Sequence, residues 1–302
     1  MPHPFRLAVT ADLHHDVPRS RPSAESLASN LLAADVDGLL LVGDTATSDG
    51  DALEQALSLF GDAGDGRPRL FVPGNHELWS RQRRVRADDL LKDELPRRVR
   101  AMGWHWLPTD PFTLPNGWAI IGNGGWYDFQ FAAKGLELPR RFYEAGLSPR
   151  VAGRYAEGLD SDADDVPAAM REFVARWNDV RFVHGIESAE RFARQRLAEF
   201  ERDLDAVKSQ RVLAAVHVVP HVALLPQVPD GPIPPDRLKY AFARAYLGSP
   251  TFGEAVATRR HVRHLVCGHS HTPRRATAEA GQQLHNVGSN YEQKRMLIFD
   301  LD

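Results

Sequence analysis

Short apolar runs alternate with stretches of helical periodicity in the first quarter of the chain. The runs cover residues 5–10, 38–42 and 69–72, and an uninterrupted apolar run such as 38–42 is typical of a strand covered on both faces. Apolar positions at helical spacing predict helices at about 23–34 and 51–60. This alternation of strand and helix predicts a mainly parallel sheet with right-handed crossovers.

Further strands are predicted in the remainder of the chain, at 118–122, 212–216 and 262–267. Helices are predicted at 81–102, with an interruption near Pro96, and at about 252–258. Three short runs near the end predict a closing meander that adds antiparallel strands to a second sheet, at about 274–277, 283–286 and 295–299.

The span from Tyr127 to about residue 209 contains no clear strand pattern. Two amphipathic stretches within it, at about 168–183 and 187–207, predict helices. These helices either pack beside the strand ends as a cap or cover a face of the sheet. We therefore expect a single domain over residues 1–302, with a helical insertion or cap at about 127–210.

Polar clusters directly follow five of the predicted strands. They are Asp12 with His14, Asp44, Asn75 with His76 and Glu77, His217, and His269 with His271. Each cluster alone is weak evidence, because isolated histidines are usually structural or exposed. Their recurrence after five strands is stronger evidence for a binding site, because ligands of parallel sheets bind at the carboxyl ends of the strands. We expect the five clusters to converge on one rim.

The side chains of these clusters offer oxygen and nitrogen donors and no thiolate. Such donors suit Mn, Fe, Zn, Co or Ni, and they argue against a closed structural zinc site. With so many ligands, two ions are favoured over one, and a carboxylate can bridge ions about 3.5–4 Å apart. Such a pair lowers the pKa of a bound water toward about 7 and neutralises phosphoryl oxygens.

The order of these motifs resembles the calcineurin-like metallophosphoesterases. The resemblance rests on Asp12-x-His14, Gly43-Asp44, Gly74-Asn75-His76-Glu77, His217 and Gly268-His269-x-His271. It spans roughly residues 5 to 300 apart from the insertion. It implies an α/β fold, a four-layer α/β/β/α sandwich of two mixed sheets, with a dinuclear metal centre on its rim.

The resemblance also assigns a role to each motif residue. The first metal would be held by Asp12, His14 and His271. Asp44 would bridge the two ions, and the second metal would be held by Asn75, His217 and His269. His76 would act on the substrate, as a hydrogen-bond donor to the phosphoryl group or as the acid for the leaving oxygen, and Glu77 would orient His76 or its loop.

Candidate substrate contacts lie outside these motifs. Trp126 and Tyr127 follow the strand at 118–122 and either stack on a base or sugar or pack in the core. Trp79 has the same two interpretations. Arg140 and Arg141 either clamp a phosphate through the guanidinium fork or are simply exposed.

Composition sets limits on the partners and the compartment. The formal net charge is −3 and charged residues make up 25% of the chain, so there is no strong nucleic-acid signal, because domains that bind nucleic acids are usually strongly basic. The N-terminus is too short and polar for a secretory signal, and no apolar run approaches the roughly 20 residues that cross a bilayer. The single cysteine, Cys267, is expected to be a buried hydrophobe. These features favour a cytoplasmic protein with no membrane partner, and they leave the oligomeric state open.

The expected function is hydrolysis of a phosphoric ester by a hydroxide that the two metals activate. The substrate is expected to be small, with nucleotides among the candidates, and a phosphodiester is slightly favoured over a monoester because an acid at His76 helps a poor alkoxide leaving group. The alternatives are a phosphomonoesterase or a nuclease on the same site. A metal-free interaction scaffold is disfavoured, because every expected ligand position is filled.

Overall fold

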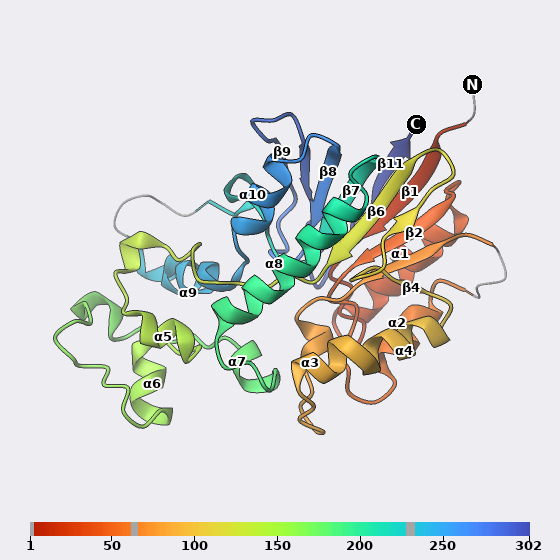
Figure 1. Cartoon of the computed structure of the whole chain (residues 1–302). Helices are drawn as coiled ribbons and strands as arrows, with labels where there is room; N and C mark the ends of the chain where they lie inside the picture. Colours follow the sequence, from red (N-terminus) through yellow and green to blue (C-terminus); the bar gives the residue numbers. More distant parts are fainter. Residues whose placement is uncertain (1–2, 62–65, 228–232) are drawn as a thin grey trace.

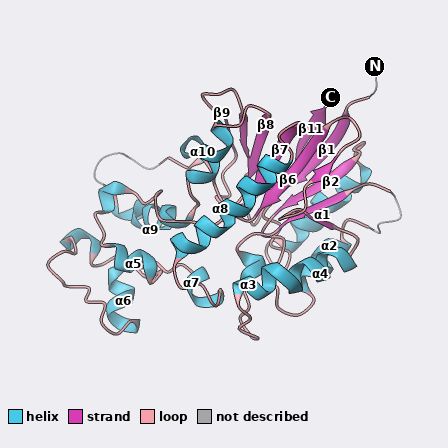
Figure 2. Ribbon diagram, viewed as in Figure 1, coloured by secondary structure: helices cyan, strands magenta, loops and turns pink. Residues whose placement is uncertain are grey.

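Two mixed β-sheets lie at the centre of the computed structural model, which describes residues 3–61, 66–227 and 233–302 (Figures 1 and 2). The five-stranded sheet has, in spatial order, β11 (Leu297–Leu301), β1 (Phe5–Thr10), β2 (Gly38–Val42), β3 (Arg69–Val72) and β4 (His105–Trp106). The six-stranded sheet has β5 (Phe112–Thr113), β6 (Trp118–Asn123), β7 (Arg211–Val216), β8 (Val262–Cys267), β10 (Gln283–Asn286) and β9 (Arg274–Thr277).

The central strands of each sheet are parallel, and the antiparallel strands lie at the edges. Strands β1 to β4 run parallel, and β11 pairs antiparallel with β1. In the other sheet β6, β7, β8 and β10 run parallel, with β5 and β9 antiparallel at the two edges. The carboxyl ends of the long parallel strands of each sheet therefore point to one edge.

Helices cover the outer faces of both sheets (Figure 1). The helices are α1 (Arg21–Ala33), α2 (Ala52–Ser58), α3 (Ala87–Asp89), α4 (Leu95–Ala101), α5 (Arg140–Glu144), α6 (Pro149–Tyr155), α7 (Asp179–Phe182), α8 (Ala189–Ala206), α9 (Leu238–Ala243) and α10 (Thr251–Ala257). Short 3₁₀ turns lie at His76–Leu78, Lys134–Leu136, Ala168–Met170, Val222–Leu224, Pro235–Arg237 and Arg244–Tyr246. None of the helices formed by the described residues has the length and apolar character that a bilayer crossing requires.

Strand alternation produces the layers of the sandwich. Leu40 and Val42 of β2 face the other sheet and pack in the cluster that includes Ile120. Leu39 and Leu41 face outward, in the cluster that also contains residues of α1, α2 and α4. A third cluster lies between the outer face of the six-stranded sheet and the helices α8 and α10. The expected α/β/β/α architecture is confirmed.

Three expectations about individual elements differ from the structure. The last predicted strand does not extend the second sheet, because β11 returns to β1 in the first sheet. The helix predicted over 168–183 is present only as the 3₁₀ turn Ala168–Met170 and the four-residue α7. The helix predicted over 81–102 begins later, and a π-helical turn, Leu90–Glu94, precedes Pro96.

Residues 127–210 contain α5 to α8 and no strand. Helix α8 lies across the outer face of the six-stranded sheet, whereas α5 and α6 extend away from the sheets (Figure 1). Helix α7 packs on Trp79 through Phe182. The treatment of this span as one insertion or cap stays a prediction.

Candidate metal centre

The loops after β1 and β2 run side by side beyond the ends of the strands. The N–H of Asp12 donates to the carbonyl oxygen of Gly43 at 3.0 Å, and the N–H of His14 donates to that of Asp44 at 2.8 Å. Parallel pairing thus continues past the sheet, and it places Asp12, His14 and Asp44 on one rim.

The backbone at five motif residues is left-handed. The φ angles are 58° at Asp12, 44° at His14, 52° at Asp44, 67° at His269 and 55° at His271. A left-handed L-residue costs about 1–2 kcal/mol, so the surrounding contacts must hold these residues in place. Such strain is concentrated at functional sites in proteins.

The structure brings the motif residues into three overlapping groups. Asp12, His14 and His271 form the first, His14, Asp44 and His76 the second, and Asp44, His217 and His269 the third; within each group the potential ligand atoms lie within 4.8 Å of one another. His14 and Asp44 are each shared by two groups. This overlap is the arrangement expected of two ions with a shared carboxylate.

Individual distances show how closely the donor atoms converge. The Nε2 atoms of His14 and His271 are 3.1 Å apart, and His14 Nε2 lies 3.6 Å from Asp44 Oδ2. On the other side, His217 Nε2 is 3.2 Å from both Asp44 Oδ1 and Asn75 Oδ1.

Two histidines have one ring nitrogen held by a backbone carbonyl. His217 Nδ1 lies 2.8 Å from the carbonyl oxygen of Val42, and His269 Nε2 lies 3.1 Å from that of Tyr246. Each carbonyl accepts an N–H from that nitrogen, so the other ring nitrogen is the one that a metal ion can bind once it carries no proton. For His269 this is Nδ1, which is buried and has no hydrogen-bond partner. The donor set therefore fits a divalent cation.

Glu77 joins the loops after β2 and β3. Its buried carboxylate accepts the N–H groups of Gly74 at 2.6 Å, Asp44 at 3.0 Å, Thr45 at 2.6 Å and Ala46 at 3.2 Å. Glu77 was expected to orient either His76 or the loop that carries it. Its hydrogen bonds are all to backbone N–H groups, which matches a role in orienting the loops.

Glycine is required at two positions of these loops. At Gly43, which has a φ of 77°, a Cβ atom would meet the ring of His217, and at Gly74 it would meet Asp44. A side chain at either position would displace a motif residue.

Burial and mutual contact shift the pKa values of the clustered groups. Burial raises the pKa of Asp12 to about 7, and it lowers the pKa values of His269 and His271 to about 3 and about 4. Burial opposes the charges of both Asp44 and His217, but their attraction outweighs it: the pKa of Asp44 falls well below its ordinary value and that of His217 rises to about 10. A cation at this position would replace the proton that the pair shares.

His76 lies at the edge of the cluster. Its ring stacks on Trp79 at a centroid distance of 3.7 Å and meets His14 edge-on at 4.4 Å. His76 Nε2 is 3.9 Å from Asp44 Oδ2, and the buried Nδ1 has no partner.

Three residues near the centre were missed by sequence reasoning. Tyr291 stacks on His14 at 4.7 Å, and Lys294 Nζ donates to the carbonyl oxygen of Asp12 at 2.6 Å. The buried Asp179 accepts a hydrogen bond from Asn75 Nδ2 at 2.8 Å. None of the three belongs to a motif, and only the fold brings them to the rim.

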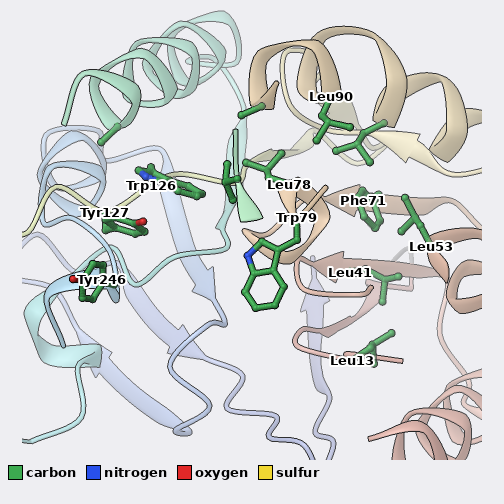
Figure 3. Close-up of a cluster of buried hydrophobic side chains, with 14 of the residues drawn as sticks. Leu13, Leu41, Leu53, Phe71, Leu78, Trp79, Leu90, Trp126, Tyr127 and Tyr246 are labelled. Carbon is green, nitrogen blue, oxygen red and sulfur yellow. The ribbon is translucent and has the colours of Figure 1, made fainter. Parts of the chain in front are cut away.

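The predicted substrate residues belong to none of the ligand groups among the described residues. Trp126 and Tyr127 are buried and stack on each other, on the side of Trp79 where Tyr246 also lies (Figure 3). Arg140 pairs with Glu144 and Glu190, and Arg141 pairs with Asp165. The structure does not bring these two arginines into the metal-ligand groups, and their role toward substrate stays a prediction.

Solved structures of similar fold cover nearly the whole chain. They include a phosphopantetheinyl hydrolase from Mycobacterium tuberculosis, with 20% identity, a TM-score of 0.65 and coverage of 98% of this chain and 97% of that chain. A dimetal phosphatase from Danio rerio has 15% identity, a TM-score of 0.51 and coverage of 99% and 93%. TT1561 of Thermus thermophilus has 10% identity, a TM-score of 0.52 and coverage of 99% and 100%. At these identities the likeness shows a common fold.

Sequence comparison supplies the family. No curated protein matches the chain. A family model described as calcineurin-like phosphoesterase matches residues 5–273, which is most of the sequence. The chain therefore belongs to the calcineurin-like phosphoesterase family.

Proposed function

We propose that this metallophosphoesterase hydrolyses a small phosphodiester. The observation that carries the proposal is the set of three overlapping ligand groups with His76 at its edge. Two ions held there would supply a nucleophile at neutral pH and would neutralise the phosphoryl oxygens.

The metal ligands would divide between the two ions as the family resemblance implies. Asp12, His14 and His271 would hold one ion, and the contacts between their side chains support this grouping. Asn75, His217 and His269 would hold the other. Asp44 would be the ligand common to both ions, in keeping with its membership of two groups.

His76 protonates the oxygen of the departing alcohol. Its position beside the cluster and its unpartnered Nδ1 support this role. Stacking on Trp79 limits the rotation of the imidazole. An acid in this position matters most for alkoxides, which are poor leaving groups, and this favours esters of ordinary alcohols.

Two pairs of an arginine and an aromatic ring lie against histidines of the centre. Exposed Arg81 lies over Trp79, whose ring stacks on His76. Exposed Arg19 lies over Tyr291, whose ring stacks on His14. A diester has two substituents, and these two pairs offer a contact to each of them.

The test is hydrolysis of bis(4-nitrophenyl) phosphate by the metal-stripped chain with and without Mn²⁺. We expect turnover that requires Mn²⁺ and that falls at least about 10³-fold in Asp44→Ala, because the shared ligand is lost. The exposed Asp51→Ala is the matched control and should retain wild-type turnover. Equal activity in Asp44→Ala, or activity that survives removal of all metal, would contradict the mechanism.

A substrate panel tests the preference for diesters. Mono- and diesters of the same alcohol are compared at matched Mn²⁺, together with the phosphopantetheinyl ester for which the mycobacterial enzyme is named. We expect larger kcat/KM values for the diesters. Faster hydrolysis of monoesters would leave the metal chemistry intact and would overturn the diester assignment.

A further inference from the structure

Asp179 is a buried carboxylate that connects α7 to the metal centre. It is 1% exposed, and its two oxygens accept three hydrogen bonds from side chains. Oδ1 accepts from Asn75 Nδ2 at 2.8 Å and from Trp79 Nε1 at 2.6 Å. Oδ2 accepts from Trp177 Nε1 at 2.8 Å.

The orientation of the Asn75 amide depends on this carboxylate. An amide presents a donor on one side and an acceptor on the other. With Nδ2 committed to Asp179, Oδ1 must face the opposite way, where it lies 3.2 Å from His217 Nε2. A flipped amide would direct its oxygen at a carboxylate, which is repulsive. Asp179 therefore keeps the oxygen of Asn75 pointed at the cluster.

The neighbouring Trp177 contacts the same side of the centre. Its ring stacks on Tyr246 at 4.7 Å, with an interplanar angle of 9°, and meets His269 edge-on at 6.0 Å. Tyr246 also provides the carbonyl oxygen that holds His269 Nε2. The segment 177–183 thus reaches Asn75 and His269, both ligands of the same proposed ion.

We propose that Asp179 is a positioning residue that sets the metal affinity of the site formed by Asn75, His217 and His269. The proposal rests on the ligand assignment in the proposed function. Carboxylates that hydrogen-bond to metal ligands fix the orientation of the ligand and raise its basicity. By reciprocity, metal binding at this site stabilises the docking of segment 177–183 on the centre.

Metal affinity is measured by calorimetric titration of the metal-stripped chain with Mn²⁺. In Asp179→Asn one carboxamide oxygen replaces two carboxylate oxygens, and its NH₂ group confronts N–H donors. We expect the Mn²⁺ at the site of Asn75, His217 and His269, here called the second Mn²⁺, to bind about 10–100-fold more weakly. The affinity of the site formed by Asp12, His14 and His271 should change little. Wild-type affinity for both ions in Asp179→Asn would overturn the proposal.

The matched control is Asp203→Asn, a substitution of another buried aspartate. Asp203 accepts a backbone hydrogen bond from Thr109 at 3.1 Å and belongs to none of the ligand groups of the described residues. This variant should bind both ions as the wild type does. An equal loss in Asp203→Asn would mean that any buried Asp→Asn change weakens metal binding, which would overturn the specific role of Asp179.

A double-mutant cycle with Asn75→Ala separates positioning from a general effect of charge. If Asp179 acts through Asn75, the double variant binds the second Mn²⁺ no more weakly than Asn75→Ala alone. Additive losses would contradict positioning through Asn75. If Asn75→Ala binds Mn²⁺ with wild-type affinity, Asn75 is not a metal ligand, and the ligand assignment on which this proposal rests is wrong.

Hydrogen exchange of the wild type gives a test that needs no variant. We expect Mn²⁺ to slow the exchange of the amides of residues 177–183. Unchanged exchange at saturating Mn²⁺ would overturn the coupling. These metal-binding and exchange readouts do not depend on turnover, so a failure of the diesterase assignment is distinguishable from a failure of this proposal.

Discussion

At the scale of single residues, the metal centre is assembled from strained backbone. Five motif residues, from Asp12 to His271, have positive φ angles. Hydrogen bonds to neighbouring strand-end loops hold several of them, such as the N–H of His269 on Asp12 Oδ1 at 2.9 Å. The strain is thus offset by contacts within the fold, and the ligands need little rearrangement to converge.

Substitution of His76 separates proton transfer from metal binding. In His76→Gln we expect both Mn²⁺ ions to bind as in the wild type and kcat to fall by about 10²–10⁴ on an alkyl diester, because the acid is lost. The loss should be smaller with a 4-nitrophenyl leaving group, which departs without protonation.

The control for this variant is His105→Gln, remote from the ligand groups of the described residues. It should keep wild-type kinetics on both substrates. Loss of both metals from His76→Gln, or equal losses for the two leaving groups, would contradict an acid role for His76.

Asp203 gives a prediction about pH and stability. Burial raises its pKa from 3.8 to about 6, so the folded chain holds a proton there that the unfolded chain releases. The stability linked to this proton is fully present below about pH 4 and is lost as the pH rises through about 6. Relative to the wild type, Asp203→Asn should gain on the order of 2 kcal/mol in free energy of unfolding between pH 4 and pH 7.

Urea denaturation at a series of pH values measures this difference. Asp205→Asn, an exposed substitution on the same helix, serves as the control for the loss of a surface carboxylate. A pH-independent difference between Asp203→Asn and the wild type would contradict the raised pKa.

The residues of the candidate ligand groups were predictable from the sequence, whereas the residues that contact them from outside these groups were not. Asp12, Asp44 and His217 each follow an apolar strand, so local pattern and strand topology place them on one rim. Asp179 and Tyr291 follow no strand, and they reach the centre through long-range packing. No local spacing encodes such contacts.

At the scale of elements, hydrophobic periodicity predicted the bounds of a helix well where the helix is long and packs along one face. Helix α8 presents Phe200 and Leu204 to the six-stranded sheet, and its predicted bounds differ from the observed ones by only a few residues. The prediction of a helix over 168–183 was wrong, because Trp177 and Asp179 make contacts at the metal centre that a continuous helix would not provide. Tertiary contacts of this kind outweigh modest helix propensity.

Truncation of Phe200, a buried residue of α8, should lower the free energy of unfolding of the domain. Phe200 is 0% exposed, and Phe200→Ala should cost about 3–5 kcal/mol in free energy of unfolding, because a cavity replaces the ring. Urea denaturation of the metal-free chain measures the loss.

The control is Val222→Ala at a side chain that is 58% exposed, where we expect a change within about 0.5 kcal/mol. A loss below about 1 kcal/mol in Phe200→Ala would show that α8 contributes little to the stability of the sandwich.

At the scale of the whole molecule, the two sheets and their helical layers follow from the sequence pattern, but the destination of the last strand does not. The alternation in β11, with Phe299 and Leu301 buried and Asp300 exposed, indicates a strand with one covered face. It does not say which sheet provides the partner. Pairing with β1 is determined by the complete fold.

The pairing of β1 with β11 has a consequence for protein synthesis. Strand β1 is synthesised before the other strands of the two sheets, and one of its edges has no partner until β11 follows. During that interval an apolar edge that includes Leu7 and Val9 offers unpaired N–H and C=O groups, which is the kind of surface that recruits foreign strands. This edge of β1 is therefore open to aggregation until β11 is made, and a chaperone that shields it would improve the yield of folded protein.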